Sequence, residues 1–377
     1  MIDISEARKY FPVTKNIIYL DHAAVAPIHL FTQKALEDYL SHFLKQGIKD
    51  YSIWYEKTEQ IRENFADFLG ADADEIGFIK STSAGLSIFA NGIEYKEGDN
   101  VVIPDIEFPA NIYPWLNLKK KGVNVKFLHS EKGYTDLNRL DELIDSRTRV
   151  VSVSWIEFLN GYRNDLSAIS ALCREKSKQF GRKIYFCVDA IQGLGALKID
   201  LKETEIDFLA ADGHKWLLGL EVAGILYCNK KILKEVHPAF VGWKSVKNPL
   251  NFTNIDFDLL ETSKKFEEGS LNVAGILSMG ASLDLINKFG IENTEKRVLS
   301  LIKTAQSLLL NKNAILESCL EEPFRSGILS FSTKNIESDY AKLIKNNIQL
   351  SMRGGLLRIS PHFYNTEEEL EKVADIL

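Results

Sequence analysis

The sequence DFLAADGHKWLLG, residues 207–219, joins a short apolar run to a lysine. Its first half, FLAA, predicts a buried strand, and the small, flexible DG pair predicts the end of that strand. His214 and Lys215 follow at once, and the apolar letters WLL come behind them. Lys215 is therefore either a surface charge on a turn or a group that the fold is built to present.

Similar strand-like runs alternate with longer helix-like stretches over the first two thirds of the chain. The strand-like runs, rich in Val, Ile and Phe and often apolar on both faces, are residues 75–81, 100–105, 124–130, 149–156, 183–190, 207–213 and 224–229. The helix-like stretches include 51–69, 84–92, 134–145 and 165–180. This alternation predicts an α/β fold with a mainly parallel seven-stranded sheet between helices.

The pattern changes after residue 262. Helix-like stretches dominate there, and only two runs, 328–333 and 356–363, are typical of strands. We expect a smaller α+β domain at the C-terminal end, which agrees with a length of 377 residues and a prior of about two domains.

Composition excludes several classes of function. A net charge of −6 argues against a nucleic-acid-binding surface. No apolar run is long enough to span a membrane, and the polar start MIDISEARKYFP is not typical of a signal peptide. The four cysteines form no C-x-x-C pair and the seven histidines no metal-spaced cluster. These patterns predict reduced thiols, a cytoplasmic location and no metal site.

Two polar residues end neighbouring predicted strands. Asp189 ends the strand of KIYFCVDAIQG, with Gln192 three residues later, and Lys215 follows the next strand. Ligands of open α/β sheets bind at the carboxyl ends of strands. A lysine that forms a Schiff base and an aspartate that keeps a pyridine nitrogen protonated are what pyridoxal phosphate (PLP) requires. The alternative for Asp189 is a helix cap.

Two further stretches predict anion sites. STSAGLS, residues 81–87, follows a strand and opens a helix, so its N–H groups could bind a phosphate, although a plain helix cap is the alternative. Arg358 lies inside an apolar strand and therefore needs an anion, either a substrate carboxylate or an internal partner. Neither a G-x-G-x-x-G nor a G-x-x-x-x-G-K-[ST] motif occurs.

These elements, in this order, make the chain resemble the class V aminotransferases of PLP fold type I, including cysteine desulfurases, selenocysteine lyases and isopenicillin-N-epimerase-like proteins. The motifs that carry the resemblance are YLDHAAVAP (19–27), STSAGLS, EFPANIYPW (107–115), VDAIQ (188–192), DGHKW (212–216), FEEGSLN (266–272) and LRISPHFYNTEEEL (357–370).

The resemblance implies a role for each matched residue. Lys215 and Asp189 would be catalytic. The implied cofactor-binding residues are Ser83, Ala84, Phe108, Glu157, Asp189, Gln192, Asp212, His214, Lys215 and Ser270. Arg358 would bind the substrate carboxylate, and Arg353, His22, Ala23 and Trp243 are expected near the substrate pocket. Phe108 would stack on the cofactor ring, and Ser270 would reach the phosphate of a partner subunit, which predicts a homodimer with shared active sites.

The chain departs from the desulfurase pattern in three ways. Only Gly354 to Leu357 separate Arg353 from Arg358, so the loop that carries the desulfurase cysteine is missing. Phe108 stands where desulfurases often have histidine. Asp212 and Glu157 stand where relatives often have a hydroxyl and an amide; we expect Asp212 to turn away from the phosphate or bond a neighbouring donor.

We therefore expect a PLP-dependent enzyme that acts on a small amino acid, first an aminotransferase. The alternative is a C–S or C–Se lyase without a persulfide cysteine, and the non-enzyme alternative is a PLP-fold binding or sensor protein. The expected division is an N-terminal segment (1–20) that packs with the small domain, a large domain (21–261) and a small domain (262–377).

Overall fold

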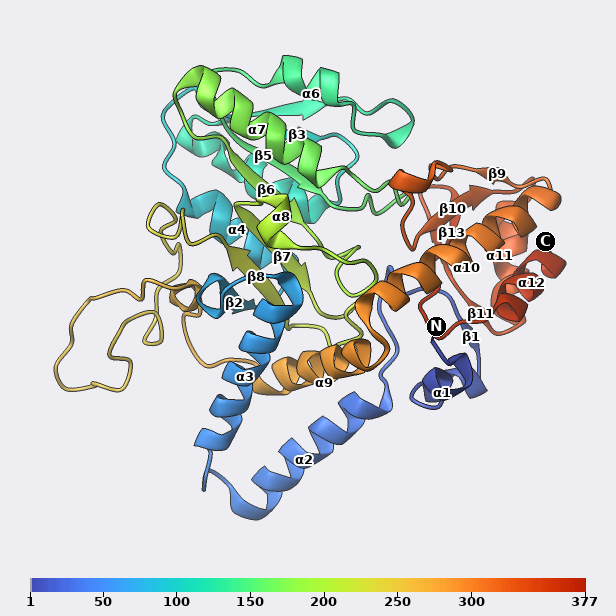
Figure 1. Cartoon of the computed structure of the whole chain (residues 1–377), viewed down its shortest axis with the longest axis horizontal. Helices are drawn as coiled ribbons and strands as arrows, with labels where there is room; N and C mark the ends of the chain where they lie inside the picture. The colour runs from blue at the N-terminus through green and yellow to red at the C-terminus, as the bar shows by residue number, and fades with distance from the viewer. Residues whose placement is uncertain (1) are drawn as a thin grey trace.

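A seven-stranded sheet forms the centre of the computed structural model, which describes residues 2–377 and all their side chains except that of Lys132 (Figure 1). In spatial order its strands are β2 (Ile76–Ile79), β8 (Gly224–Cys228), β7 (Phe208–Asp212), β6 (Tyr185–Asp189), β5 (Thr148–Ser154), β3 (Asn100–Pro104) and β4 (Asn124–Leu128). These are the seven strands that the sequence predicts. The strands from β7 to β4 are parallel, and β8 runs against both of its neighbours, so the mainly parallel sheet is confirmed.

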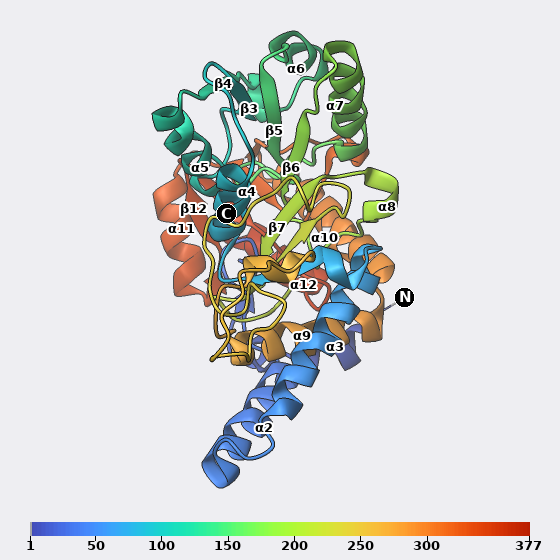
Figure 2. The same cartoon turned by 90° about the vertical axis from the view of Figure 1, so that its left-hand side faces the viewer.

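Helices cover both faces of this sheet, as Figures 1 and 2 show. The helices of this unit are α3 (Ser52–Leu69), α4 (Thr82–Gly92), α5 (Tyr113–Leu116), α6 (Leu137–Leu143), α7 (Leu166–Phe180), α8 (Leu201–Thr204) and α9 (Val273–Phe289). A further helix, α2 (Leu30–Gln46), packs on α9 and extends away from the sheet (Figures 1 and 2). Along β7, Phe208 and Ala210 face a core with α4, whereas Leu209 and Ala211 face a core with α7 and α9. Alternate residues therefore enter different cores, which explains why the strands are apolar on both faces.

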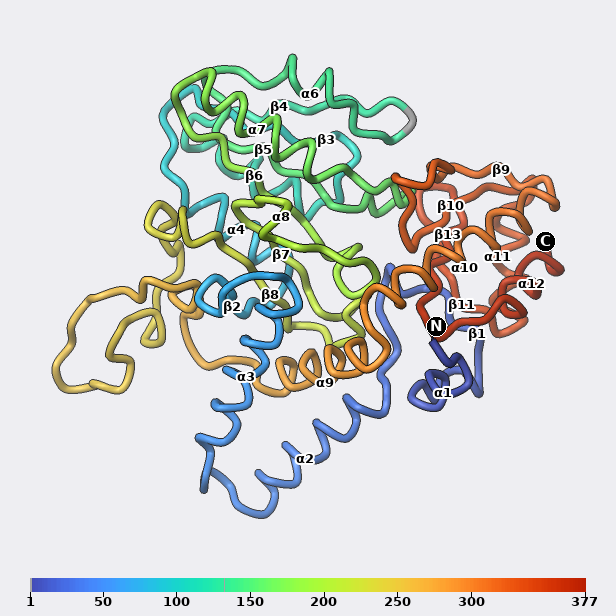
Figure 3. The backbone as a smooth tube through the Cα atoms, viewed as in Figure 1, coloured from blue at the N-terminus to red at the C-terminus, as the bar shows by residue number. Residues whose placement is uncertain are grey.

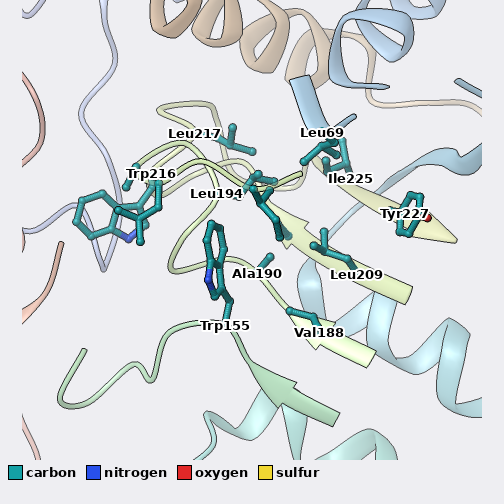
Figure 4. Close-up of a cluster of buried hydrophobic side chains, with 14 of the residues drawn as sticks. Leu69, Trp155, Val188, Ala190, Leu194, Leu209, Trp216, Leu217, Ile225 and Tyr227 are labelled. Carbon is teal, nitrogen blue, oxygen red and sulfur yellow. The ribbon is translucent and has the colours of Figure 1, made fainter. Parts of the chain in front are cut away.

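The larger of these cores continues under the loop that carries Lys215. Trp216 and Leu217 are buried there together with Leu194, at the ends of β6 and β7 (Figure 4). The WLL run of the opening sequence thus fixes the backbone on the C-terminal side of the lysine, because burying large apolar side chains is strongly favourable.

A second, smaller sheet lies toward the C-terminus. Its strands, in spatial order, are β12 (Ser351–Arg353), β13 (Leu356–Ile359), β10 (Leu329–Ser332) and β9 (Ile315–Leu316), and the helices beside it are α10 (Ile291–Asn311), α11 (Ile336–Lys345) and α12 (Glu367–Ile376). The two late runs of the sequence form β10 and β13. The short strands β9 and β12 and the pair described next carry too few residues for a sequence pattern.

The N-terminal segment contacts this smaller unit. It contains α1 (Ile4–Arg8) and β1 (Ile18–Tyr19), and β1 pairs in parallel with β11 (Ile348–Gln349). Leu20 belongs to the core of the smaller unit, and both termini lie on its side of the molecule (Figure 3). Helix α9, by contrast, packs on α2 and α3 within the core of the large sheet. The domain division remains a proposal, and this packing favours a boundary between α9 and α10.

Candidate active site

The predicted site residues converge on one cavity of about 320 Å³ at the carboxyl ends of the parallel strands. Ten of them line it: Ala23, Ser83, Phe108, Asp189, Gln192, Asp212, His214, Lys215, Arg353 and Arg358. They come from the stretch between β1 and α2, from the loop after β3, from the ends of β6 and β7, from α4 and from the β12–β13 hairpin. The cavity is therefore assembled from parts that lie far apart in the sequence.

Asp189 is buried at the end of β6 and has a free oxygen. Its Oδ1 accepts a hydrogen bond from the N–H of Ile191 at 3.0 Å, whereas Oδ2 has no partner among the described residues. Burial raises the pKa of Asp189 to about 6, against the opposing effects of that N–H and of Lys215. An unpaired buried oxygen is costly unless a ligand satisfies it. A protonated ring nitrogen is a suitable donor.

Lys215 lies on a tight turn after β7. The N–H of Leu218 donates to the carbonyl of Lys215 at 3.0 Å, and Leu218 takes the left-handed φ of 58°. Burial lowers the pKa of Lys215 to about 8, although Asp189 acts in the opposite direction. A lysine with a lowered pKa is partly neutral near physiological pH and is thus a nucleophile or a base.

Gly213, which the sequence suggests as a flexible hinge, has a packing role instead. Its φ lies outside the left-handed region, and an added Cβ would lie 2.7 Å from Met279 Sδ and 3.0 Å from the Ala223 carbonyl. Glycine is required here because α9 and the start of β8 approach the backbone closely. The structure thus shows a close contact at Gly213, and the flexibility of the DG pair stays a prediction.

A candidate anion site lies at the N-terminus of α4. Ser81 caps this 11-residue helix by accepting from the N–H of Ala84 at 3.2 Å, and Ser81, Thr82 and Ser83 all line the cavity. The free N–H groups and the helix dipole favour a phosphate at this end. The helix cap is confirmed, and because the stretch also faces the cavity, phosphate binding stays a prediction.

Asp212 bonds neighbouring donors, as expected. Its Oδ1 accepts from the N–H of Gly213 at 2.9 Å and lies 3.2 Å from His214 Nδ1. The N–H of Asp212 donates to Thr82 Oγ1 at 2.9 Å, which ties the end of β7 to the start of α4. A carboxylate near an anion site is tolerated when such donors compensate its charge.

Two other side chains form walls of the cavity. Phe108 is half-exposed, with its ring centroid 5.7 Å from Lys215 Nζ, and makes an edge contact with Phe158. Gln192 donates to the carbonyl of Ala23 at 3.1 Å and accepts from Trp216 Nε1 at 3.0 Å. Phe108 thus offers an aromatic face, and Gln192 joins the N-terminal segment to the loop of the lysine.

Arg358 is buried, only 1% exposed, yet it lines the cavity. Its Nη1 donates to the Phe158 carbonyl at 2.6 Å, and Nη2 is 3.7 Å from Asp21 Oδ1. Both Nε and Nη2 lack hydrogen-bond partners among the described residues. Burial lowers the pKa of Arg358 to about 10, against the effect of Asp21. The protein therefore satisfies Arg358 only in part, and its free Nε and Nη2 donors fit a substrate carboxylate.

Five predicted residues lie outside the cavity wall. The side chain of Ala84 does not line it, and Ser270 and Trp243 are exposed elsewhere. His22 is fully buried, between the Ser360 carbonyl at 2.9 Å and the Tyr364 hydroxyl at 2.8 Å. Its placement supports packing rather than a substrate contact.

Glu157 is also buried behind the wall, where Asn164 Nδ2 donates to its Oε1 at 3.0 Å. Burial raises the pKa of Glu157 well above its ordinary value, and Glu107 adds to this effect. The side chain that reaches the cavity from this loop is the neighbouring Phe158. The placement of Glu157 does not favour a direct contact with a cofactor.

Sequence reasoning missed Glu107, which supports the site from behind. Both the N–H and the hydroxyl of Ser154 donate to its carboxyl group at 2.5 Å, and Ser154 lies opposite Asp189 in the β5–β6 register and lines the cavity. Burial raises the pKa of Glu107 to about 8, and Asp189 adds to this effect. The available signal was its position just before Phe108.

The four cysteines, Cys173, Cys187, Cys228 and Cys319, are buried and free, and none lines the cavity. Burial raises the pKa of the Cys173, Cys187 and Cys228 thiols. Among the described residues, no cluster of His, Cys, Asp or Glu is arranged to hold a metal ion. A separate search of residues 2–377 finds no helix that combines the length and apolar character of a membrane span.

Comparison with known proteins agrees with this geometry. The profile of the family Aminotransferase class-V matches residues 18–373. A probable cysteine desulfurase of Methanothermobacter thermautotrophicus is 30% identical, over 99% of this chain and 96% of that protein. An uncharacterised aminotransferase of Bacillus subtilis, YcbU, is 26% identical, over 98% of this chain and 95% of that protein.

Solved structures share the fold. An apo cysteine desulfurase of Thermococcus onnurineus NA1 has a TM-score of 0.90 at 24% identity and covers 100% of this chain and 97% of its own. The cystine C–S lyase C-DES, in complex with cysteine persulfide, has a TM-score of 0.90 at 22% identity and covers 97% of this chain and 99% of its own.

The cavity residues fit the cofactor of this family. Asp189 offers a buried unpaired oxygen to a pyridine nitrogen, Lys215 an amine to an aldehyde, and the N-terminus of α4 its N–H groups to a phosphate. The chain therefore belongs to the class-V aminotransferase family and is a pyridoxal-phosphate-dependent enzyme of fold type I.

Proposed function

We propose that this enzyme transfers the amino group of a small amino acid. The observation that carries the proposal is the convergence of Lys215, Asp189 and Arg358 on one cavity, each with a group free to meet a ligand. A binding or sensor protein would have no need of all three together.

Each of these residues has one task. Bound PLP supplies an aldehyde for the substrate amine and a ring that accepts electrons when the α-proton leaves. Lys215 would take that proton as the base and deliver it to the former aldehyde carbon of the cofactor, so that the amino group stays on the cofactor and the keto acid leaves. Asp189 keeps the ring nitrogen protonated, and Arg358 holds the substrate carboxylate so that the α-proton faces Lys215. Phe108 would pack beside the ring, and the N-terminus of α4 with His214 would hold the phosphate.

The second candidate is direct C–S or C–Se elimination. It is favoured by the relatives named cysteine desulfurase and by the likeness to a cystine C–S lyase. Elimination uses the same base, ring partner and carboxylate clamp as transamination. A persulfide route is not supported, because it requires a mobile thiolate and all four cysteines are buried.

We also propose a cytoplasmic homodimer with shared active sites. Free, buried cysteines agree with a reducing compartment. Ser270 is exposed and outside the cavity of its own chain, which agrees with a role at the phosphate of a partner subunit.

A panel of amino acids tests the proposed function. The purified enzyme, loaded with PLP, is mixed with each amino acid, and the cofactor spectrum, keto acid, ammonia and sulfide are followed. Keto acid without ammonia or sulfide is expected, and Lys215→Ala should abolish it. Release of sulfide or ammonia as the main product would replace transamination by elimination.

The cysteines provide the control for the persulfide route. Each of the four Cys→Ala variants should keep the activity of the unmodified enzyme. Loss of activity in any one of them, with PLP still bound, would reveal a thiol nucleophile.

A further inference from the structure

A short hairpin brings two arginines to the same side of the substrate cavity. Strands β12 and β13 are antiparallel, with Ser351 opposite Arg358 and Arg353 opposite Leu356. Successive residues of a strand point to opposite faces, so Arg353 and Arg358 share one face. Both line the cavity.

The turn of this hairpin follows Arg353 directly and sets the direction of the backbone there. Gly354 and Gly355 form a two-residue connection with φ of +57° and +76°. This left-handed pair is what the tightest hairpin turns require, and glycine adopts it without strain. Diagonal neighbours on such a pair of strands have Cα atoms about 7–8 Å apart. The two guanidinium groups can therefore reach the same small ligand.

The two arginines differ in what they bind within the protein. Arg358 is buried and donates to the Phe158 carbonyl, with Asp21 3.7 Å away. Arg353 is exposed to the cavity and takes part in no ion pair or side-chain hydrogen bond among the described residues. Asp21, the nearby carboxylate, is already bonded to the Ser351 hydroxyl at 2.6 Å.

The remaining acids of the cavity are also engaged. Asp212 accepts from the N–H of Gly213 and lies beside His214. Asp189 faces the position of the ring nitrogen in the proposed function. One substrate carboxylate on Arg358 would thus leave the charge of Arg353 without a counter-ion. The excess positive charge is felt at Lys215, where Arg358 and Arg353 add to the effect of burial in lowering the pKa.

We propose that Arg353 selects an amino acid with a second carboxylate, a short dicarboxylic substrate such as aspartate or glutamate. Arg358 holds the α-carboxylate, and Arg353 pairs with the carboxylate of the side chain. This inference rests on the proposed function, because it assigns the substrate of the same site. The inference depends on the shortness of the β12–β13 hairpin, because this short hairpin leaves Arg353 facing the cavity directly.

Matched pairs of ligands test it on the PLP-loaded enzyme. Aspartate is compared with asparagine, and glutamate with glutamine, by titration of the cofactor spectrum; each pair has nearly the same shape and differs in one charge. Calorimetric binding of succinate against butyrate gives a readout without turnover. A charged hydrogen-bonded pair contributes about 1.5–3 kcal/mol to binding. We therefore expect each dicarboxylate to bind roughly tenfold or more tightly than the matched ligand with one carboxylate fewer.

Two variants locate the effect. Arg353→Ala should remove the preference for dicarboxylates, by weakening aspartate and succinate binding more than asparagine and butyrate binding. Arg353→Lys should restore part of the preference. Met352→Ala is the control, because Met352 lies on the opposite face of the hairpin, and it should keep the full preference.

The outcomes separate this inference from the proposed function. Equal or tighter binding of asparagine, glutamine and butyrate, or a preference for dicarboxylates that survives in Arg353→Ala, would overturn the role of Arg353. Either result would leave the proposed function intact. A spectrum that no amino acid perturbs would overturn both.

Discussion

Asp189 and Lys215 lie at neighbouring strand ends, where burial changes the pKa values of both side chains. Burial acts on both, and it moves their pKa values toward each other, up to about 6 for the aspartate and down to about 8 for the lysine. Neither group finds a full partner among the described residues. In the proposed function the cofactor supplies the missing partner of both, since it offers a nitrogen to the acid and an aldehyde to the amine.

The lowered pKa of Lys215 predicts how cofactor bonding depends on pH. Only the neutral amine attacks the aldehyde, and with a pKa of about 8 the neutral fraction rises as the pH rises through 8. The rate at which added PLP bonds to the apoprotein should follow this rise. Stopped-flow absorbance between pH 6 and 10 measures it.

Two variants frame that measurement. Lys215→Ala should show no bonding at any pH. Asp189→Asn should move the midpoint downward, because the charge of Asp189 raises the pKa of the lysine. A midpoint above 10, as for an exposed lysine, would contradict the buried environment described for this residue.

Sequence motifs predicted cavity residues such as Asp189, but the sequence could not show which neighbouring side chains are buried behind the cavity wall. Asp189, Lys215 and Arg358 follow from strand ends and from an arginine in an apolar run. His22 and Glu157 lie next to cavity residues in the sequence, but their side chains are buried behind the wall. Glu107 acts through Ser154 on another strand, so its position just before Phe108 was the signal available in the sequence and its role could not be read from that position alone.

At the scale of elements, the turn after β7 is positioned by what packs against it. Gly213 lies against Met279 of α9 and the Ala223 carbonyl, and Trp216 is buried beneath. The β12–β13 hairpin is fixed by its glycine turn instead. The two elements therefore position Lys215 and Arg353 by different means, one by packing and one by backbone conformation.

Replacement of Gly213 by alanine tests the packing of this turn. The new methyl group would clash with Met279 and with the Ala223 carbonyl, and overpacking of this kind costs about 1–3 kcal/mol. We expect a lower melting temperature by calorimetry and weaker PLP retention on dialysis. Gly269→Ala is the matched control for stability, because its only neighbour within 4 Å is Trp243 Nε1 at 3.9 Å. Equal stability of both variants would show that Gly213 is not tightly packed.

For the whole molecule, the sequence predicted the large sheet well because most of its strands are buried on both faces and are therefore continuous apolar runs. The edge strand β4 is partly exposed, but its run of residues was also recognisable. The smaller unit was less predictable, since β9, β11 and β12 have only two or three residues each. The sequence also did not show where α9 packs, because α9 follows residue 262 but contacts α2 and α3. Chain order does not encode such long-range packing.

The surface of a single chain leaves a large apolar segment uncovered. Between β8 and α9 the chain extends away from the sheet, at the left of Figure 1, and several of its large side chains are exposed. They are Phe240, Val241, Trp243, Leu250, Phe252, Ile255 and Phe257. Exposed apolar groups gathered in this way are typical of protein interfaces. Ser270 follows shortly after this segment.

A homodimer would cover this segment and bring Ser270 to the phosphate of the partner. We expect a dimer by ultracentrifugation at micromolar concentration, with an interface on the order of thousands of Å². The double variant Phe252→Ser and Phe257→Ser should shift the equilibrium toward monomer and lose PLP on dialysis. Ser270→Ala should stay dimeric and bind PLP more weakly, which separates assembly from phosphate binding. A monomeric protein that retains PLP tightly would show that each chain builds a complete site alone.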